Sequence, residues 1–127
     1  MRHEFKPDGT ERQRKGETKR AGGGGAARAY WCAACTTRVA GEDAAIEVGG
    51  AHRHRFVNPA GLEYEIACFR QASCLADGEP TLEFTWFPGF EWSFASCRNC
   101  QEHLGWCFVS DGARFFGLIL ARLLGPI

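Results

Sequence analysis

The chain has 127 residues, the length of one small domain, and 45% of them are hydrophobic, which is enough to build a packed core. Its net charge is zero, but residues 1–29 hold eight Lys or Arg against four Asp or Glu, and residues 30–127 hold seven against eleven. The second segment is therefore mildly acidic. This argues against a nucleic-acid partner, because nucleic-acid surfaces require clustered basic side chains on the domain itself.

The first segment, residues 1–29, is predicted to be a disordered, basic tail. It is polar, shows no hydrophobic period and runs into four consecutive glycines at 22–25. It therefore buries too little apolar surface to offset the entropy of ordering it. It also lacks the apolar run of a signal peptide, and the longest apolar stretch, at 115–124, is too short to cross a bilayer. We expect a cytoplasmic protein with no membrane partner.

The second segment, residues 30–127, is predicted to be a single, mostly β domain. Four windows alternate between apolar and polar residues, as in a strand with one buried face: 62–68, 81–86, 90–95 and 104–109. The second and third windows meet at Phe87-Pro88-Gly89-Phe90. Gly after Pro suits a type II turn because glycine takes the positive φ, so the two windows are predicted to form a hairpin. No window has a helical period.

Two Cys-x-x-Cys pairs predict one structural zinc site. The pairs are Cys32 with Cys35 and Cys97 with Cys100. Each pair places two thiolates on a tight turn, and two such turns complete a tetrahedral site of four sulfur ligands with no open position. A redox function would fit a βαβ pattern, and the sequence contains none. The long separation of the pairs means that the metal would tie the start of the domain to its later half.

The remaining cysteines and the histidines are predicted to be structural. Cys68 continues an apolar strand face and is expected in the core. Cys74 follows a polar turn, and Cys107 follows a tryptophan on its strand and so faces away from it. The histidines at 52 and 54 are expected at an exposed strand start, and His103 is expected to be structural and near the second cysteine pair.

Three tryptophans form the second signal in the sequence. Trp86, Trp92 and Trp106 each lie on the apolar phase of their window. From pattern alone a packed core is the ordinary interpretation, and the alternative is a cage whose indole faces hold a small flat ring or a quaternary ammonium. Glu83 and Glu91 fall on the opposite phase, which favours a neutral guest. The phenylalanines on the same apolar phase are Phe84, Phe90, Phe94 and Phe108.

The order of these motifs resembles the cereblon C-terminal thalidomide-binding (CULT) domain family, in particular its short single-domain bacterial members. The similarity is carried by Trp-Phe-Pro-Gly-Phe-Glu-Trp at 86–92, by the second cysteine pair, and by His-Leu-Gly-Trp-Cys-Phe at 103–108. An Asn-Pro turn at 58–61 and Phe-Gly-Leu at 116–118 fit the same pattern. The resemblance runs from about Tyr30 to the last residue.

The resemblance implies a zinc-anchored domain of two antiparallel sheets, called a β-tent, that binds small molecules and catalyses no reaction. Its partners would be cyclic imides and similar rings such as glutarimide, thalidomide, hydantoin and uridine, or a C-terminal cyclic imide on a damaged protein. One zinc ion would sit on the four cysteines of the two pairs. The ligand-binding residues implied for this chain are Asn58, Pro59, Phe84, Trp86, Trp92, Trp106 and Phe108.

Two departures from the family matter. Phe84 stands where cereblon has a histidine, so the histidine's side-chain bond to the ring is lost. The backbone bonds of the family, an accepting carbonyl at Phe84 and a donating N–H at Trp86, are unaffected by this change. The eukaryotic protein also has a Lon-like domain and a ligase-docking segment before this domain, whereas this sequence has only the short tail. We therefore expect no role as a ubiquitin-ligase adaptor.

Two other functions compete with ring binding. Zinc-bearing methionine sulfoxide reductases also have two Cys-x-x-Cys pairs and a His-Leu-Gly segment like that at 103–105, and Cys107 would then be the nucleophile. The sequence around Cys107 lacks the pattern of those enzymes. The second alternative is a reader of methylated cations, which would use the same aromatic cage.

Overall fold

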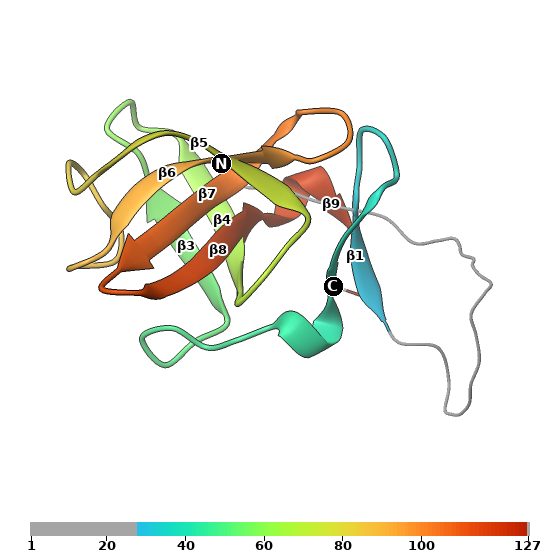
Figure 1. Ribbon diagram of the computed structural model, residues 1–127, viewed down its shortest axis with the longest axis horizontal. Coiled ribbons are helices and arrows are strands. Elements are labelled where there is room, and N and C mark those ends of the chain that lie inside the picture. Colours follow the sequence, from blue (N-terminus) through green and yellow to red (C-terminus); the bar gives the residue numbers. More distant parts are fainter. Residues whose placement is uncertain (1–27, 127) are drawn as a thin grey trace.

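The computed structural model describes residues 28–126, which form two antiparallel sheets (Figure 1). The large sheet has the strand order β3-β4-β8-β7-β6-β5, and the small sheet has the order β2-β1-β9. This confirms the mostly β fold with two antiparallel sheets. The elements are β1 (Ala29–Cys32), β2 (Arg38–Gly41), η1 (Glu42–Ala44), β3 (Arg53–Val57), β4 (Glu63–Phe69), β5 (Cys74–Thr81), β6 (Glu91–Cys97), β7 (His103–Ser110), β8 (Ala113–Ile119), η2 (Leu120–Arg122) and β9 (Leu123–Leu124).

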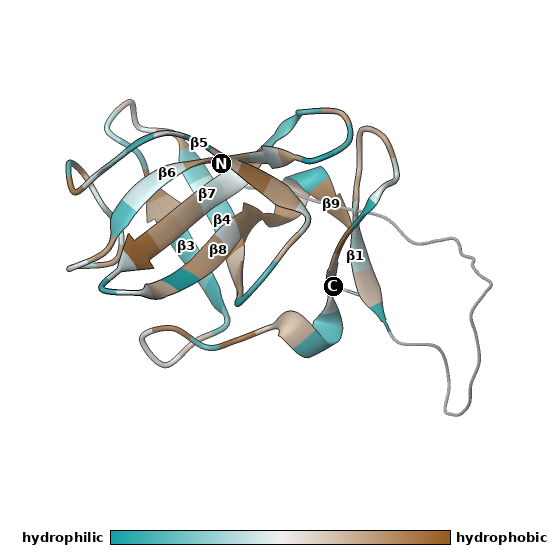
Figure 2. Ribbon diagram, in the orientation of Figure 1, coloured by the Kyte–Doolittle hydropathy of each residue, from teal (hydrophilic) through white to brown (hydrophobic). Residues whose placement is uncertain are grey.

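The central strands of the large sheet are buried on both faces, and each face has its own core. One face packs against the small sheet, where the ring of Phe69 lies edge-on to Tyr30 at a centroid distance of 5.1 Å. The other face packs against the loop 82–90, through Phe87 on Phe108 and Phe115. The two central strands β7 and β8 are accordingly the most hydrophobic part of the sheet (Figure 2).

Three of the four predicted strand windows are confirmed. The windows 62–68, 90–95 and 104–109 correspond to β4, β6 and β7. Alternation also places neighbours on opposite faces, so that Trp106 belongs to one core and Cys107 to the other. The fully buried Cys68 lies in the core, as predicted.

The predicted strand at 81–86 is wrong. β5 ends at Thr81, and residues 82–90 form an irregular loop between β5 and β6. Phe84 has a φ of 60°, in the left-handed region, which an extended strand cannot accommodate. Its ring is 66% exposed instead of continuing an apolar strand face. Trp86 is therefore presented by a loop, and the hairpin between β5 and β6 is longer than predicted.

The predicted turn at 87–90 is confirmed. The N–H of Phe90 donates to the carbonyl of Phe87 at 2.9 Å, and Gly89 has a φ of 88°. Glycine adopts this conformation without the steric cost that a Cβ imposes. The hydroxyl of Thr85 donates to the Phe90 carbonyl at 2.7 Å and closes the base of the turn. This bond holds the backbone before the turn, at Thr85, against the backbone after it, at Phe90.

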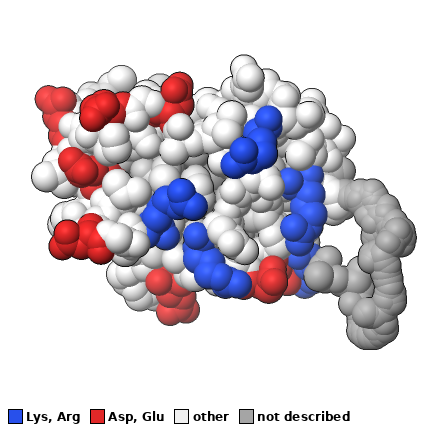
Figure 3. Space-filling model, in the orientation of Figure 1, with Lys and Arg blue, Asp and Glu red and all other residues white. Residues whose placement is uncertain are grey.

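Residues 1–27 of the predicted tail lie outside the described residues. The first strand, β1, begins at Ala29. Among the residues that the structure does describe, no helix has the length and hydrophobicity needed to cross a membrane. On the face shown in Figure 3, most acidic side chains gather at the end of the large sheet that lies away from the small sheet, and the basic side chains lie nearer the small sheet.

Candidate functional site

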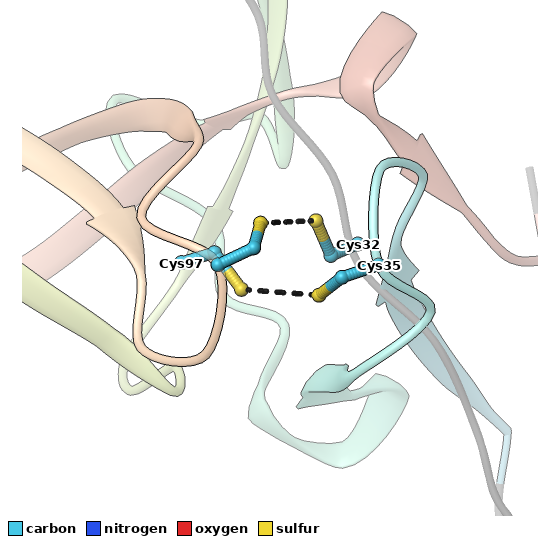
Figure 4. A group of neighbouring side chains, drawn as sticks. Cys32, Cys35 and Cys97 are labelled. Carbon is cyan, nitrogen blue, oxygen red and sulfur yellow. Dashed lines mark hydrogen bonds between the residues drawn. The ribbon is translucent and has the colours of Figure 1, made fainter.

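The two Cys-x-x-Cys pairs occupy matching turns at facing ends of the two sheets. The first turn joins β1 to β2, and the second joins β6 to β7. In both turns the residue four positions after the first cysteine, Thr36 or Gln101, has a positive φ and donates its N–H to the carbonyl of that cysteine. This backbone path points both cysteines of a pair to the same side, so the two turns present four thiols to one another (Figure 4).

The spacing of the four sulfur atoms fits one tetrahedral metal ion. The Sγ atoms of Cys32 and Cys100 are 3.7 Å apart, as are those of Cys35 and Cys97, and all four lie within 4.8 Å of one another. Metal–sulfur bonds of about 2.3 Å at tetrahedral angles place the sulfurs about 3.8 Å apart. A disulfide would require about 2.05 Å. The residues present therefore fit a four-thiolate metal centre that leaves no position open for a substrate.

The electrostatic surroundings of the thiols differ within the cluster. Burial raises the pKa of Cys32 and of Cys97. At Cys35 burial also acts to raise the pKa, but hydrogen bonds from Asn99 and Thr37 outweigh it and lower the pKa to about 6. The hydroxyl of Thr37 lies 3.2 Å from the Cys35 sulfur. Metal binding would have to displace the protons from the buried thiols, because only the thiolate is a ligand.

A second candidate site is a cavity of about 310 Å³ on the face of the large sheet that carries the loop 82–90. All seven residues that the sequence singled out for ligand binding line it. Three further lining residues were not predicted: Tyr64, Phe94 and His103. Tyr64 and Phe94 occupy the same apolar phase of their predicted strands as the site residues do, so the alternation could have identified them as lining residues. The full lining is Asn58, Pro59, Tyr64, Phe84, Trp86, Trp92, Phe94, His103, Trp106 and Phe108.

The inner walls of the cavity are held by other aromatic rings. Trp86 and Trp106 meet at 74° with ring centroids 4.7 Å apart. Phe56 stacks on Trp86 at 4.8 Å and 13°, and Tyr64 lies edge-on to Trp106 at 5.3 Å. Phe108 is 1% exposed and stacks on a ring of β8. These contacts fix the planes of both indoles.

The outer wall is formed by Trp92 and the loop residues beside it. The indole N–H of Trp92 donates to the carbonyl of Glu83 at 2.7 Å, which ties strand β6 to the loop. Trp92 also lies edge-on to Phe94 at 5.4 Å. Phe84 and Phe94 are 66% and 47% exposed, so the cavity opens to solvent on this side.

Several backbone groups of the loop have no hydrogen-bond partner among the described residues, and two of them belong to residues that line the cavity on either side of Thr85. They are the carbonyl of Phe84 and the N–H of Trp86, whereas the neighbouring N–H groups of Thr85 and Phe87 both have acceptors. A donor and an acceptor two residues apart at the wall of a cavity form a pair that an amide or imide edge can satisfy.

The turn at 58–61 contributes Asn58 and Pro59 to the cavity lining. The side-chain carbonyl of Asn58 accepts from the N–H groups of Ala60 and Leu62, at 3.0 and 2.9 Å. The backbone N–H of Asn58 also donates to the Leu62 carbonyl at 2.9 Å. These bonds fix Asn58 and Pro59 at the cavity rim.

His103 lies between the cavity and the cysteine cluster. Its Nε2 lies 2.8 Å from the Gly105 carbonyl, and Arg122 Nη1 lies 3.4 Å from its Nδ1. The neutral ring satisfies both contacts, by donating from Nε2 and accepting at Nδ1. Burial and the charge of Arg122 lower the pKa of His103 to about 4. The ring is therefore a neutral wall of the cavity at physiological pH.

The remaining cysteines are buried away from the cavity. Burial raises the pKa of Cys107, which is 2% exposed on the opposite face of β7. It also raises the pKa of Cys68 to about 12. A nucleophilic cysteine needs access and a lowered pKa, and Cys107 has neither, which argues against the reductase hypothesis. His52 and His54 are half-buried, not exposed as predicted, and their rings bond to the backbone carbonyls of Ile46 and Ala51, respectively.

Comparison with known proteins identifies relatives of the described domain. No family model matches the chain. Curated proteins that match are named cereblon: the chicken (Gallus gallus) protein is 35% identical over 78 residues, the zebrafish (Danio rerio) protein is 38% identical over 78, and that of Drosophila grimshawi is 44% identical over 46. These matches cover 57%, 57% and 32% of this chain and 18%, 18% and 7% of the relatives, so the chain spans less than a fifth of their length. The matched part is the C-terminal region of cereblon, and the described domain is similar to that region, which is consistent with a cereblon-like CULT domain.

Proposed function

We propose that the chain is a non-catalytic binding protein that holds cyclic imides and related flat rings, such as glutarimide, thalidomide, hydantoin and uridine, in the aromatic cavity. The observation that carries this proposal is the pair of unpartnered backbone groups at Phe84 and Trp86. An imide offers one N–H flanked by two carbonyls. Its N–H would donate to the Phe84 carbonyl while one ring carbonyl accepts from the Trp86 N–H.

The walls of the cavity favour an uncharged ring. Within residues 28–126, the cavity lining contains no carboxylate, Lys or Arg. The indole faces of Trp86, Trp92 and Trp106 would supply dispersion contacts, and a few polar groups would fix the orientation of the guest. A methylated cation would gain cation–π attraction but would meet no counter-charge in the lining. The ring of a cyclic imide at the C-terminus of a protein would enter in the same way.

The four-cysteine cluster is proposed to hold one structural zinc ion. Four thiolates at tetrahedral spacing are the ligand set typical of structural zinc. The ion would bridge the β1–β2 turn and the β6–β7 turn, so its binding energy would contribute to folding. It would have no direct part in binding the ring, because all four coordination positions are occupied by protein ligands.

The proposal is tested by tryptophan fluorescence of the zinc-loaded protein, titrated with thalidomide and with uridine. Because the guest has few heavy atoms, we expect micromolar dissociation constants. Trp92→Ala is expected to abolish the saturable change. Trp31→Phe is the matched control, since Trp31 lies on β1 of the small sheet, outside the cavity.

A modified ligand tests the backbone pair itself. Thalidomide methylated on its glutarimide nitrogen cannot donate to the Phe84 carbonyl and leaves that acceptor buried without a partner. Such a loss costs about 1–3 kcal/mol, or roughly 5- to 150-fold in affinity. Equal affinities of the two compounds would contradict the proposed orientation, and the absence of any fluorescence change in folded, zinc-loaded protein would contradict ring binding. Displacement of thalidomide by a trimethyl-lysine peptide would instead support a cation reader.

A further inference from the structure

The cavity has more room than a single small ring requires, and it opens on one side. Its volume of about 310 Å³ lies at the lower end of the range for drug-sized ligands, about 300–1,000 Å³. The inner walls Trp106 and Phe108 are 8% and 1% exposed, whereas Phe84 and Phe94 on the outer side are 66% and 47% exposed. A guest whose ring lies against the inner walls would therefore extend its substituent past Phe84 and Phe94.

Two acidic residues, Asp77 and Glu83, are neighbours of the exposed phenylalanines at this exit, one across the sheet and one along the chain. Asp77 on β5 is the cross-strand partner of Phe94 on β6, so both side chains project from the cavity face of the sheet. Glu83 precedes Phe84 in the loop, and its carbonyl accepts from the Trp92 indole. Both acidic residues are exposed.

Neither carboxylate is neutralised by a described residue. Asp77 and Glu83 form no ion pair within residues 28–126, whereas Glu63 and Glu65 on β4 pair with Arg55 and Arg53. Glu91 cannot contribute at the cavity, because it lies next to Trp92 on β6 and faces the other side of the sheet. The site thus has an uncharged interior and a negatively charged exit.

We propose that the guest is a ring that carries a positively charged substituent, such as an amine or a basic chain, with the cation beside Asp77 and Glu83. The inference rests on the proposed ring binding and specifies its ligand class. A cation at the exit keeps most of its hydration, so each rim contact is worth about 0.2–1 kcal/mol, or roughly 1.4- to 5-fold in affinity. Salt screens such contacts because the charges are exposed.

The test compares three thalidomide derivatives with a short chain at the same position of the phthalimide ring: an aminoalkyl, its N-acetylated form and a carboxyalkyl. Dissociation constants are measured with the zinc-loaded protein at low and at high salt. With two such contacts the amine is expected to bind roughly 2- to 25-fold more tightly than the neutral acetyl compound at low salt, and the carboxylate is expected to bind more weakly than both. The advantage of the amine should disappear at high salt.

Variants assign the effect to the two carboxylates. In Asp77→Asn combined with Glu83→Gln the amine and the acetyl compound are expected to bind equally, while Glu63→Gln, on the opposite face, should preserve the difference. If the acetyl compound binds and the amine has no advantage, the charged-substituent inference is refuted and ring binding stands. An advantage that persists in the double variant also refutes it. If neither compound binds, ring binding fails as well. The ligand series in the unmodified protein decides the matter even if the double variant does not fold.

Discussion

His103 makes the stability of the domain sensitive to acid in a defined pH range. Its neutral ring donates from Nε2 to the Gly105 carbonyl and accepts at Nδ1 from Arg122. Protonation would place a second N–H against the guanidinium of Arg122 and would put a positive charge into a mostly buried site. The folded state therefore binds this proton less readily than the unfolded state does.

The size of the effect follows from the two pKa values. The pKa of His103 is about 4 in the folded domain, against 6.5 for an unperturbed histidine. Because the folded pKa is the lower one, the unfolded state binds more protons between pH 6.5 and pH 4. Stability is then fully present above pH 6.5 and falls as the pH drops through this range. Between pH 7 and pH 4.5 the loss amounts to about 2 kcal/mol.

The assay compares urea unfolding of the unmodified protein with that of His103→Gln at pH 7 and at pH 4.5. Glutamine retains a donor for the Gly105 carbonyl and does not titrate in this range. Acid also weakens binding of the metal by the thiolates, and this contribution is common to both proteins. The difference between them should therefore change by about 2 kcal/mol in favour of the variant at the lower pH. Identical pH dependence of the two proteins, or a pKa near 6.5 for His103 in an NMR titration, would refute this explanation.

Three further perturbations test the metal centre, the core and the cavity loop. Cys97→Ser removes one proposed metal ligand and is expected to abolish stoichiometric zinc binding, measured by metal analysis, and to lower the melting temperature, measured by circular dichroism. The control Cys107→Ser replaces a buried cysteine outside the cluster and should retain zinc. Zinc retention by the Cys97 variant would contradict the proposed site. Phe69→Ala deletes a fully buried ring that packs on Tyr30 and should lower the free energy of unfolding, measured in a urea titration, by about 3–5 kcal/mol. A loss below about 1 kcal/mol would show that the interface between the sheets is not a packed core. Gly89→Ala places a Cβ on a residue whose φ is 88°, which should destabilise the domain by about 1 kcal/mol. Because the turn carries Trp86, the variant should also bind thalidomide more weakly. An unchanged affinity would show that the turn does not set the position of the indoles.

The sequence identifies those parts of the fold in which one face of a strand is buried. The two faces of β6 and of the first half of β4 differ in exposure, whereas β7 is buried on both faces along 104–108 and alternates between large and small apolar residues. β5 shows no such pattern: its middle reads Ala-Asp-Gly-Glu-Pro, and seven of its eight residues are exposed or half-buried. It is the edge strand of the large sheet, where Pro80 and charged side chains are tolerated because one row of backbone groups needs no partner.

The failure at 81–86 has a different physical origin. Leu82, Phe84 and Trp86 alternate perfectly with polar residues, yet the backbone leaves the sheet after Thr81. Their spacing reflects the loop's position across the opening of the cavity, where Leu82 and Phe84 are exposed and Trp86 turns inward. Period-two alternation cannot distinguish a strand from a loop in which some of the alternating apolar side chains are exposed and others turn inward. The seven implied site residues lie on the cavity wall all the same, because the motif order, and not the periodicity, identified them. Their role in binding stays a prediction.

Strand β6 connects the two candidate sites directly. Cys97 ends the strand at the cysteine cluster, and Trp92 lies five residues earlier at the cavity, about 17 Å away along an extended backbone. On β7, Gly105 and Trp106 face Ala95 and Phe94 of β6, so the same ladder of hydrogen bonds supports both tryptophans. Any loosening of the cluster would be transmitted along this hairpin to the indoles. The tryptophans are therefore expected to report on a metal ion bound by the cluster: titration with a chelator, without any added ligand, should change the tryptophan emission.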